Sequence, residues 1–344
     1  MRVAVSGVGG GVGQSVMKAL SLATLPVDIV PVDVQPFSAG LYRGTSPGAV
    51  LPRPETAEGI GAWADWLAAE KIVALIPGSD HDLLPLARVR AEWEGAGATK
   101  VLVSDLSLVQ ACRDKALTHQ KLAAAGLPVP DSAWDLSAEE AVAWARSHGY
   151  PVVLKPRDGF ASRGVHVIRD EEELRFFFPR TPNPIVQEHL SDGGREEEFT
   201  CAVFVDREGE PAGTFMARRD LSGGATYRAE VNVWPEIRDL LMAIGRTLRP
   251  RGPLNVQLRQ TARGPVPFEL NIRCSGTAAI RAHFGYNEPE MLLRHYVLGE
   301  PLAPPAPRTG YAFRYWNEIF LEGVDREQLQ RSSAELKGTV RAWP

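Results

Sequence analysis

The sequence predicts an α/β protein of more than one domain, with a parallel α/β domain first and mixed α+β structure after it. Over roughly residues 1–112, short apolar runs alternate with helical stretches, the pattern of βαβ units around a parallel sheet. Further on, two strands within 151–168 look antiparallel, and from about residue 185 strands dominate. A length of 344 residues is enough for at least two domains that each bury a core.

The first domain is expected to begin with a strand at residues 2–6 and a helix at about 14–22. Further buried strands are expected at 28–34, 72–76 and 101–103, because each is a short apolar run bounded by glycine, proline or polar residues. Alternation of such strands with helices predicts a parallel sheet.

Glycines follow the first strand at Gly7, Gly9 and Gly11, and Asp33 follows about twenty residues later. This arrangement suggests a dinucleotide-binding turn, but no register of the G-x-G-x-x-G pattern ends on a glycine. We therefore favour a tight strand-to-helix turn, with a helix N-terminus that could still hold a substrate carboxylate. Residues 80–82 (Asp-His-Asp) end the third strand, where open α/β sheets bind ligands, and a helix N-cap fits them equally well.

From residue 114 on, the expected helices and strands no longer alternate regularly. The expected helices are 114–125, 138–147, 235–248 and 288–298, and the expected strands are 151–155, 164–168, 185–189, 199–205, 212–218, 254–259 and 266–272.

Composition excludes several classes of protein. No run of 18 apolar residues is present, and the apolar start runs into glycines without a cleavage site, so we expect neither a membrane span nor a signal peptide. A net charge of −4 argues against nucleic-acid binding. Three widely spaced cysteines, Cys112, Cys201 and Cys274, suggest a reducing compartment. The expected location is the cytoplasm.

Lys155 ends a buried strand and is followed by a glycine- and serine-containing loop, residues 156–164. A cation beside such a loop can hold a polyphosphate, while backbone N–H groups fold over it. An ordinary hairpin turn with a solvent-reaching lysine explains the segment equally well.

A second feature is the expected hairpin of residues 255–273. Alternate residues of a strand share a face, so Glu269, Asn271 and Arg273 line one face and Phe268, Leu270 and Ile272 the other. Across the hairpin, Gln257 can meet the first set. Oxygen donors with few charges suit Mg²⁺ that also binds phosphates, and Arg273 would neutralise a phosphoryl group. Taken singly, each residue fits a solvated polar face better.

Two weaker features complete the set. The strand at 185–189 contains Gln187 and Glu188, which could meet an adenine edge. Further on, Glu198 could accept hydrogen bonds from ribose hydroxyls. Residues 195–198 also suit a solvated turn. Three arginines flank the stretch 222–224, namely Arg218, Arg219 and Arg228. Their side chains could clamp a substrate carboxylate or a phosphate. It is an equally good explanation that they are ordinary surface residues.

Taken in order, these segments resemble the ATP-grasp superfamily, most closely one module of the carbamoyl phosphate synthetase large subunit and biotin carboxylase. The resembling segments are 113–115 with 125–130, 151–156 with its loop, 187–188, 198–199, 255–257 and 269–273. The resemblance implies the ATP-grasp fold: an N-terminal parallel α/β domain (1–112), a linker helix and small α+β lid (113–188), and a larger antiparallel core with the metal site (189–304). A C-terminal segment (305–344) suggests no role. ATP is expected between the lid and the core.

The resemblance also implies residue roles. ATP phosphates would contact Lys115 and Lys155, with the loop closing as a lid through Gly159, Ser162, Arg163 and Gly164. Adenine would meet Gln187 and Glu188, and ribose would meet Glu198. One or two Mg²⁺ ions, with Mn²⁺ as a substitute, would be held by Gln257, Glu269 and Asn271. Arg273 would face an acyl phosphate, which makes Arg273 and Lys155 the expected catalytic residues.

The implied activity is an ATP-dependent carboxylate–amine ligase that acts on a small molecule such as an amino acid or peptide and releases ADP and phosphate. Its partners would be a small carboxylate and a small amine, and the sequence leaves a homodimer open. A phosphotransferase or a ligase with a non-amine acceptor is the alternative. A nicotinamide-dependent oxidoreductase and a non-catalytic nucleotide-binding regulator rank lower. The chain departs from its relatives at the glycine-poor loop and at Gln257, where a carboxylate is common.

Overall fold

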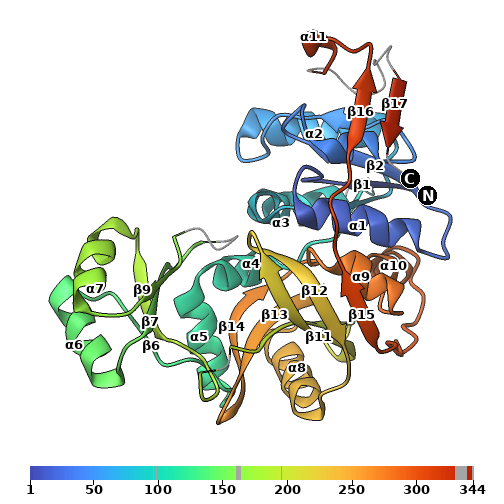
Figure 1. Ribbon diagram of the computed structural model, residues 1–344. Coiled ribbons are helices and arrows are strands. Elements are labelled where there is room, and N and C mark those ends of the chain that lie inside the picture. The colour runs from blue at the N-terminus through green and yellow to red at the C-terminus, as the bar shows by residue number, and fades with distance from the viewer. Residues whose placement is uncertain (96, 98, 160–163, 195, 330–338, 343–344) are drawn as a thin grey trace.

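The computed structural model describes residues 1–344 except 96, 98, 160–163, 195, 330–338 and 343–344. It contains a five-stranded, a six-stranded and a four-stranded sheet and a two-stranded hairpin (Figure 1). No helix in the described part of the chain is long and apolar enough to cross a membrane.

The first sheet is parallel, in the order β3-β2-β1-β4-β5. Its chain moves from β1 outward to β2 and β3 and then returns to the other side of β1, so the direction of winding switches between β1 and β4. Ligands bind at such switch points in open α/β sheets. The strands are β1 (Arg2–Val5), β2 (Asp28–Asp33), β3 (Ala49–Val50), β4 (Ala74–Ile76) and β5 (Lys100–Val101).

Helices cover both faces of this sheet, which is why its strands are apolar throughout. Val3 and Val5 pack in the same core as α1 (Gly11–Ser21), whereas Ala4 packs with α2 (Ala57–Ala69) and α3 (Asp80–Gly95). A short 3₁₀ helix, η1, spans Ala39–Tyr42. The expected parallel sheet is confirmed.

Two short helices leave the first domain, α4 (Leu106–Arg113) and α5 (Lys115–Ala124). Asp114 separates them and caps α5, because its carboxylate accepts hydrogen bonds from the backbone N–H groups of Ala116 and Leu117 at 2.8 and 3.3 Å.

The four-stranded sheet is antiparallel, in the order β6-β9-β7-β8, as the sequence predicts for residues 151–168. Helix α6 packs against it and begins at a capping box in which Ser137 and Glu140 satisfy each other's backbone N–H groups. The elements are β6 (Ser132–Trp134), α6 (Ala138–His148), β7 (Val152–Pro156), β8 (His166–Ile168), α7 (Glu171–Phe177), η2 (Phe178–Arg180) and β9 (Pro184–Glu188).

The six-stranded sheet is antiparallel throughout, in the order β14-β13-β10-β11-β12-β15. One of its faces packs against α8 (Pro235–Leu248), whose six buried residues form a helical apolar stripe. The strands are β10 (Glu198–Val205), β11 (Pro211–Ser222), β12 (Ala225–Val231), β13 (Gly252–Thr261), β14 (Gly264–Asn271) and β15 (Gly310–Phe313).

A β-bulge in the β13–β14 hairpin corrects one expectation. Gln257 pairs with Glu269, but the register then shifts and Leu258 pairs with Pro267, so Phe268 is the extra residue. Strict alternation placed Phe268 on the core face beside Leu270, and the bulge instead turns its ring toward Lys155.

The segment after β14 contributes to the large sheet again and then reaches the N-terminal domain. Strand β15 forms the last strand of the large sheet, and the two-stranded sheet of β16 and β17 lies beside the N-terminal domain (Figure 1). The remaining elements are α9 (Ala278–His283), α10 (Glu288–Leu292), the π-helical turn η3 (Leu293–Val297), β16 (Ile319–Glu322), α11 (Arg326–Leu329) and β17 (Thr339–Ala342).

Candidate active site

One cleft of about 900 Å³ joins the three sheets. Its lining comes from the glycine turn and switch point of the parallel sheet, from β7, β8 and β9 of the small sheet, and from β10 to β14 of the large sheet. Residues far apart in the sequence therefore face the same space, and most of the expected site residues are among them.

Lys155 is buried at the end of β7, and its Nζ donates hydrogen bonds to Gln187 Oε1 at 2.8 Å and to the Phe268 carbonyl at 3.3 Å. Burial, assisted by the charge of Lys115, lowers the pKa of Lys155 to about 7. Neither hydrogen-bond partner carries a charge. An anionic ligand in the cleft would therefore favour the protonated lysine.

Lys115 begins α5 and reaches the same end of the cleft. Its Nζ donates to the carbonyls of Gly159 at 2.6 Å and Arg157 at 3.3 Å, the residues that open the loop after β7. Burial lowers the pKa of Lys115 even though the charge of Glu269 opposes that shift. Gly159 lines the cleft, and Gly164 has the positive φ of 69° that favours glycine. Two expected loop residues, Ser162 and Arg163, lie outside the described residues.

The expected adenine and ribose residues come from β9 and β10. Both Gln187 and Glu188 line the cleft, and Glu188 Oε1 accepts hydrogen bonds from the Asp131 backbone N–H at 2.8 Å and from Arg263. Glu198 is ion-paired with Arg219 at 2.5 Å and with Arg259 at 3.5 Å. Two arginines thus fix the position of the Glu198 carboxylate in the cleft.

Apolar side chains gather in the lining of this end of the cleft. Val165 and Val167 are each 42% exposed although both are aliphatic, and they line the cleft together with Val153 and the displaced Phe268. Exposed apolar side chains that gather in one cleft mark a binding surface, and a planar base suits such a slot. The sequence analysis missed Phe268 and the valines, because only the bulge and the antiparallel pairing bring them together.

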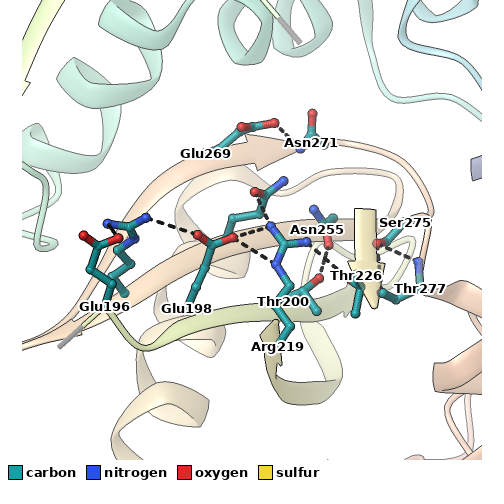
Figure 2. A network of polar contacts seen from close by, with 12 residues as sticks. Glu196, Glu198, Thr200, Arg219, Thr226, Asn255, Glu269, Asn271, Ser275 and Thr277 are labelled. Atoms are coloured by element: carbon teal, nitrogen blue, oxygen red, sulfur yellow. Dashed lines mark hydrogen bonds and ion pairs between the residues drawn. The ribbon is translucent and has the colours of Figure 1, made fainter. Parts of the chain in front are cut away.

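The three expected metal ligands share one face of the β13–β14 hairpin. Gln257 lies opposite Glu269, and Asn271 Nδ2 donates to Glu269 Oε1 at 3.1 Å (Figure 2). Gln257 Oε1 accepts a hydrogen bond from Arg219 at 2.8 Å, so it is the least available of the three. Within the described residues, no group of three or more His, Cys, Asp and Glu side chains is placed to hold a metal ion. The hairpin set fits Mg²⁺ only together with oxygens from phosphate and water.

Arg273 follows β14 and pairs with Asp80 in the first turn of α3, with nitrogen–oxygen distances of 2.8 and 2.7 Å. Burial opposes its charge, but the charge and hydrogen bonds of Asp80 outweigh burial and raise the pKa of Arg273. From the sequence, Asp80 could serve either a ligand contact or a helix cap. In the structure, Asp80 joins the N-terminal domain to the segment that follows β14.

The structure does not bring the three arginines of the expected clamp together. Arg218 and Arg219 are neighbours on β11 and point to opposite faces, so only Arg219 lines the cleft. Arg218 is 44% exposed and pairs with Glu197 and Glu230, and Arg228 is 60% exposed. The exposure of Arg218 and Arg228 is that of ordinary charged surface residues.

The glycine turn is fixed by Asp33, whose carboxylate accepts hydrogen bonds from the N–H groups of Gly9 at 2.7 Å and Gln35 at 2.9 Å. A Cβ at Gly13 would lie 2.5 Å from the Gly7 carbonyl oxygen. Close packing therefore accounts for these residues, as the sequence analysis favoured. The C-terminal segment does reach the cleft, through Arg314, although the sequence suggested no role for it.

A three-sheet protein with this cleft has the ATP-grasp fold, and comparison with known families agrees. Residues 112–196 match the ATP-grasp domain family, and residues 181–319 match a family described as ATP-grasp in the biosynthetic pathway with Ter operon. The chain belongs to the ATP-grasp superfamily.

Three curated relatives illustrate the range of similarity. An uncharacterised protein of Sinorhizobium fredii, y4rH, is 28% identical over 62% of this chain and 51% of its own length. The glutamate–LysW ligase ArgX of Sulfurisphaera tokodaii is 42% identical over 31% of this chain and 40% of its own. The carbamoyl phosphate synthase large chain of Thermus thermophilus is 26% identical over 54% of this chain and 19% of its own. The chain thus spans about half the length of the first relative, and less of the others.

Solved structures share the fold over most of the chain. The biotin carboxylase domain dimer of Hydrogenobacter thermophilus 2-oxoglutarate carboxylase, with MgADP and bicarbonate, has a TM-score of 0.68 at 16% identity and covers 90% of this chain and 73% of that one. The N5-carboxyaminoimidazole ribonucleotide synthetase of Thermus thermophilus has a TM-score of 0.70 at 17% identity, with coverage of 93% and 83%. The expected resemblance to carbamoyl phosphate synthetase and biotin carboxylase is confirmed.

Proposed function

We propose that the protein is an ATP-dependent carboxylate–amine ligase that works through an acyl phosphate and releases ADP and phosphate. The observation that carries this proposal is the convergence of Lys115, Lys155, Glu269 and Arg273 on one cleft. A buried lysine, a half-buried lysine, a carboxylate–amide set and a fixed guanidinium suit the transfer of a phosphoryl group from ATP to a carboxylate. The 42% identity with a segment of a glutamate–LysW ligase supports amide formation.

In this proposal, the adenine lies between Phe268 and the valines of the small sheet, and Glu198 accepts hydrogen bonds from the ribose. Lys155 and Lys115 bind the phosphates, and Arg273 stabilises the negative charge that develops during transfer. Glu269 and Asn271, with Gln257, would hold Mg²⁺, which supplies positive charge to the phosphate oxygens.

The protein's own contribution is position and the exclusion of water. Arg273 cannot swing away from the reacting carboxylate, since Asp80 holds it by two hydrogen bonds. Formation of an acyl phosphate beside Arg273 replaces the poor leaving group of the carboxylate by phosphate. The enclosing sheets keep water from hydrolysing this acyl phosphate. A neutral amine then attacks the acyl carbon, and phosphate departs.

The proposal is tested by measuring ADP and phosphate release from MgATP with pooled carboxylic acids and pooled amines. A ligase releases both products only when one acid and one amine are present. ADP release without phosphate would indicate the phosphotransferase alternative. MgATP binding without ADP formation would favour the regulator, and a change in nicotinamide absorbance without ATP dependence would favour the oxidoreductase.

A further inference from the structure

The cleft continues beyond the phosphate end to the switch point of the parallel sheet, where three carboxyl groups gather. Asp33 ends β2, Glu55 precedes α2, and Asp82 lies in the first turn of α3; all three line the cleft. Burial, then the charges of Asp33, Glu55 and Asp80, raise the pKa of Asp82 to about 7. The negative charges of its neighbours therefore act on Asp82 in the same direction as burial.

These carboxyl groups lack positive partners. Asp80 is ion-paired with Arg273, but in the described part of the chain no ion pair reaches Asp33, Glu55 or Asp82. Asp82 accepts a hydrogen bond from Ser6 at 2.5 Å, and Asp33 accepts only from backbone N–H groups. A cation from outside the chain would relieve this repulsion.

An independent observation at the same place also points to a ligand. Ser38 is only 7% exposed, lines the cleft, and its hydroxyl has no hydrogen-bond partner among the described residues. The oxygen itself is not fully enclosed, so it opens into the cleft, where a ligand can bond to it. A Cβ built on Gly9 would lie 2.4 Å from Ser38 Oγ and 3.2 Å from an oxygen of Asp33, so the two side chains face the same point.

We propose that Asp33, Ser38, Glu55 and Asp82 form the subsite for the amine substrate, which enters as an ammonium ion and gives a proton to Asp82. This inference rests on the proposed ligase function. We call these four residues the acidic subsite. Arg53, exposed on its rim, and His81 also line this end of the cleft.

The acidic subsite is next to the reacting end of the cleft. Asp80 and Asp82 share the first turn of α3, and Asp80 contacts Arg273 directly. Because Asp82, Asp80 and Arg273 all line one cleft, an amine on the acidic subsite would share that cleft with the acyl phosphate beside Arg273.

The chemical step balances without any further reactant. The ammonium ion transfers one proton to the Asp82 carboxylate and becomes a neutral amine. Its lone pair forms the bond to the acyl carbon, and the bond from that carbon to the phosphate oxygen breaks with its electron pair on phosphate. A second N–H proton goes to the departing phosphate, which leaves a neutral amide.

The test is amine binding without turnover. The full-length protein, saturated with MgADP, is titrated by calorimetry with methylammonium, glycinamide, glycine and 1,4-diaminobutane, and with 1,4-butanediol and acetate as uncharged and anionic controls. We expect at least one amine to bind, the diol and acetate to bind more weakly, and both Asp82→Asn and Glu55→Gln to weaken amine binding about tenfold or more.

Glu58→Gln is the matched control, because it removes the same charge three residues from Glu55 outside the cleft. It should leave amine binding unchanged, and all three variants should bind MgADP normally. Because Glu55 is exposed, Glu55→Gln should fold, and this variant tests the proposal even if Asp82→Asn does not fold. Failure of every amine to bind, tighter binding of acetate, or unchanged amine binding in Glu55→Gln would overturn the proposal. Because no ATP is consumed, these outcomes are separate from failure of the ligase function.

Discussion

Asp80 and Arg273 are 193 residues apart in the sequence and form a two-point ion pair, with distances of 2.7 and 2.8 Å. This contact ties the first helix turn after β4 to the strand that carries Glu269 and Asn271. The N-terminal domain therefore contributes to the cleft itself, because its Asp80 orients the Arg273 guanidinium there.

Asp80→Asn should lower kcat about 10²-fold, because a misplaced charge stabilises a transition state poorly. Leaving Arg273 without its carboxylate should also destabilise the fold by roughly 1–3 kcal/mol. MgATP affinity should change little. Steady-state kinetics and denaturant unfolding measure these effects, with Asp239→Asn as the control for an exposed ion pair. Unchanged kcat would show that the contact serves stability alone.

Glu269→Ala should abolish turnover while the fold is retained, because Glu269 is the one carboxylate of the candidate metal set. We expect a loss of at least about 10³-fold in kcat that added Mg²⁺ does not restore. Activity is measured across a Mg²⁺ and Mn²⁺ series, and circular dichroism checks the fold. Full activity in this variant would remove the metal assignment.

Lys155 should take up a proton when nucleotide binds. Its folded pKa is about 7, so at pH 8 the free protein holds it mostly neutral, and an adjacent phosphate would restore its charge. Calorimetry in buffers of different ionisation enthalpy should show an uptake approaching one proton per MgATP at pH 8 and little at pH 6. Lys155→Met should abolish this difference. Equal proton uptake by Lys155→Met and the wild type would show that a group other than Lys155 takes up the proton.

The same pKa fixes the sign of a stability effect. Between the folded pKa of about 7 and the usual lysine value of 10.5, the unfolded chain binds a proton that the folded protein does not. Stability should therefore rise with pH across this window in the nucleotide-free wild type, relative to Lys155→Met. Urea unfolding at pH 6 and pH 9 measures the free energy of unfolding of both proteins. A stability of the wild type relative to Lys155→Met that falls as the pH rises would contradict the lowered pKa.

Phe268→Ala should raise KM for ATP about tenfold with a smaller change in kcat, because base stacking contributes to ground-state binding. Phe176→Ala, which removes an exposed ring on α7, is the control. An unaltered KM for ATP would mean that the base lies elsewhere.

The sequence predicted what depends on local pattern. Alternation along two strands indicated that Gln257 could meet Glu269 across the hairpin, and the structure pairs these two residues. The apolar run ending at Lys155 predicted a buried strand before a loop, and the structure shows that the lysine is buried as well. Alternation failed at Phe268, because a bulge depends on the paired strand and leaves little local signal.

Other site features depend on contacts between distant segments. No local pattern links Asp80 to Arg273, or places Ser38 against Gly9. Arg218 and Arg219 looked equivalent in the sequence, and only the sheet shows that one faces the cleft and the other solvent. The glycines and acidic residues at the strand ends could be recognised in the sequence, but only the fold shows that they line the same cleft.

We propose above all that ATP phosphorylates a carboxylate in this cleft. The most direct measurement of this step uses a pool of carboxylic acids labelled with ¹⁸O in the carboxylate, incubated with MgATP, pooled amines and the protein, followed by mass spectrometry of the phosphate released. We predict that each phosphate carries one labelled oxygen and that the second product is an amide one water lighter than its acid and amine. ADP formation that depends on both pools but yields unlabelled phosphate would contradict an acyl-phosphate mechanism.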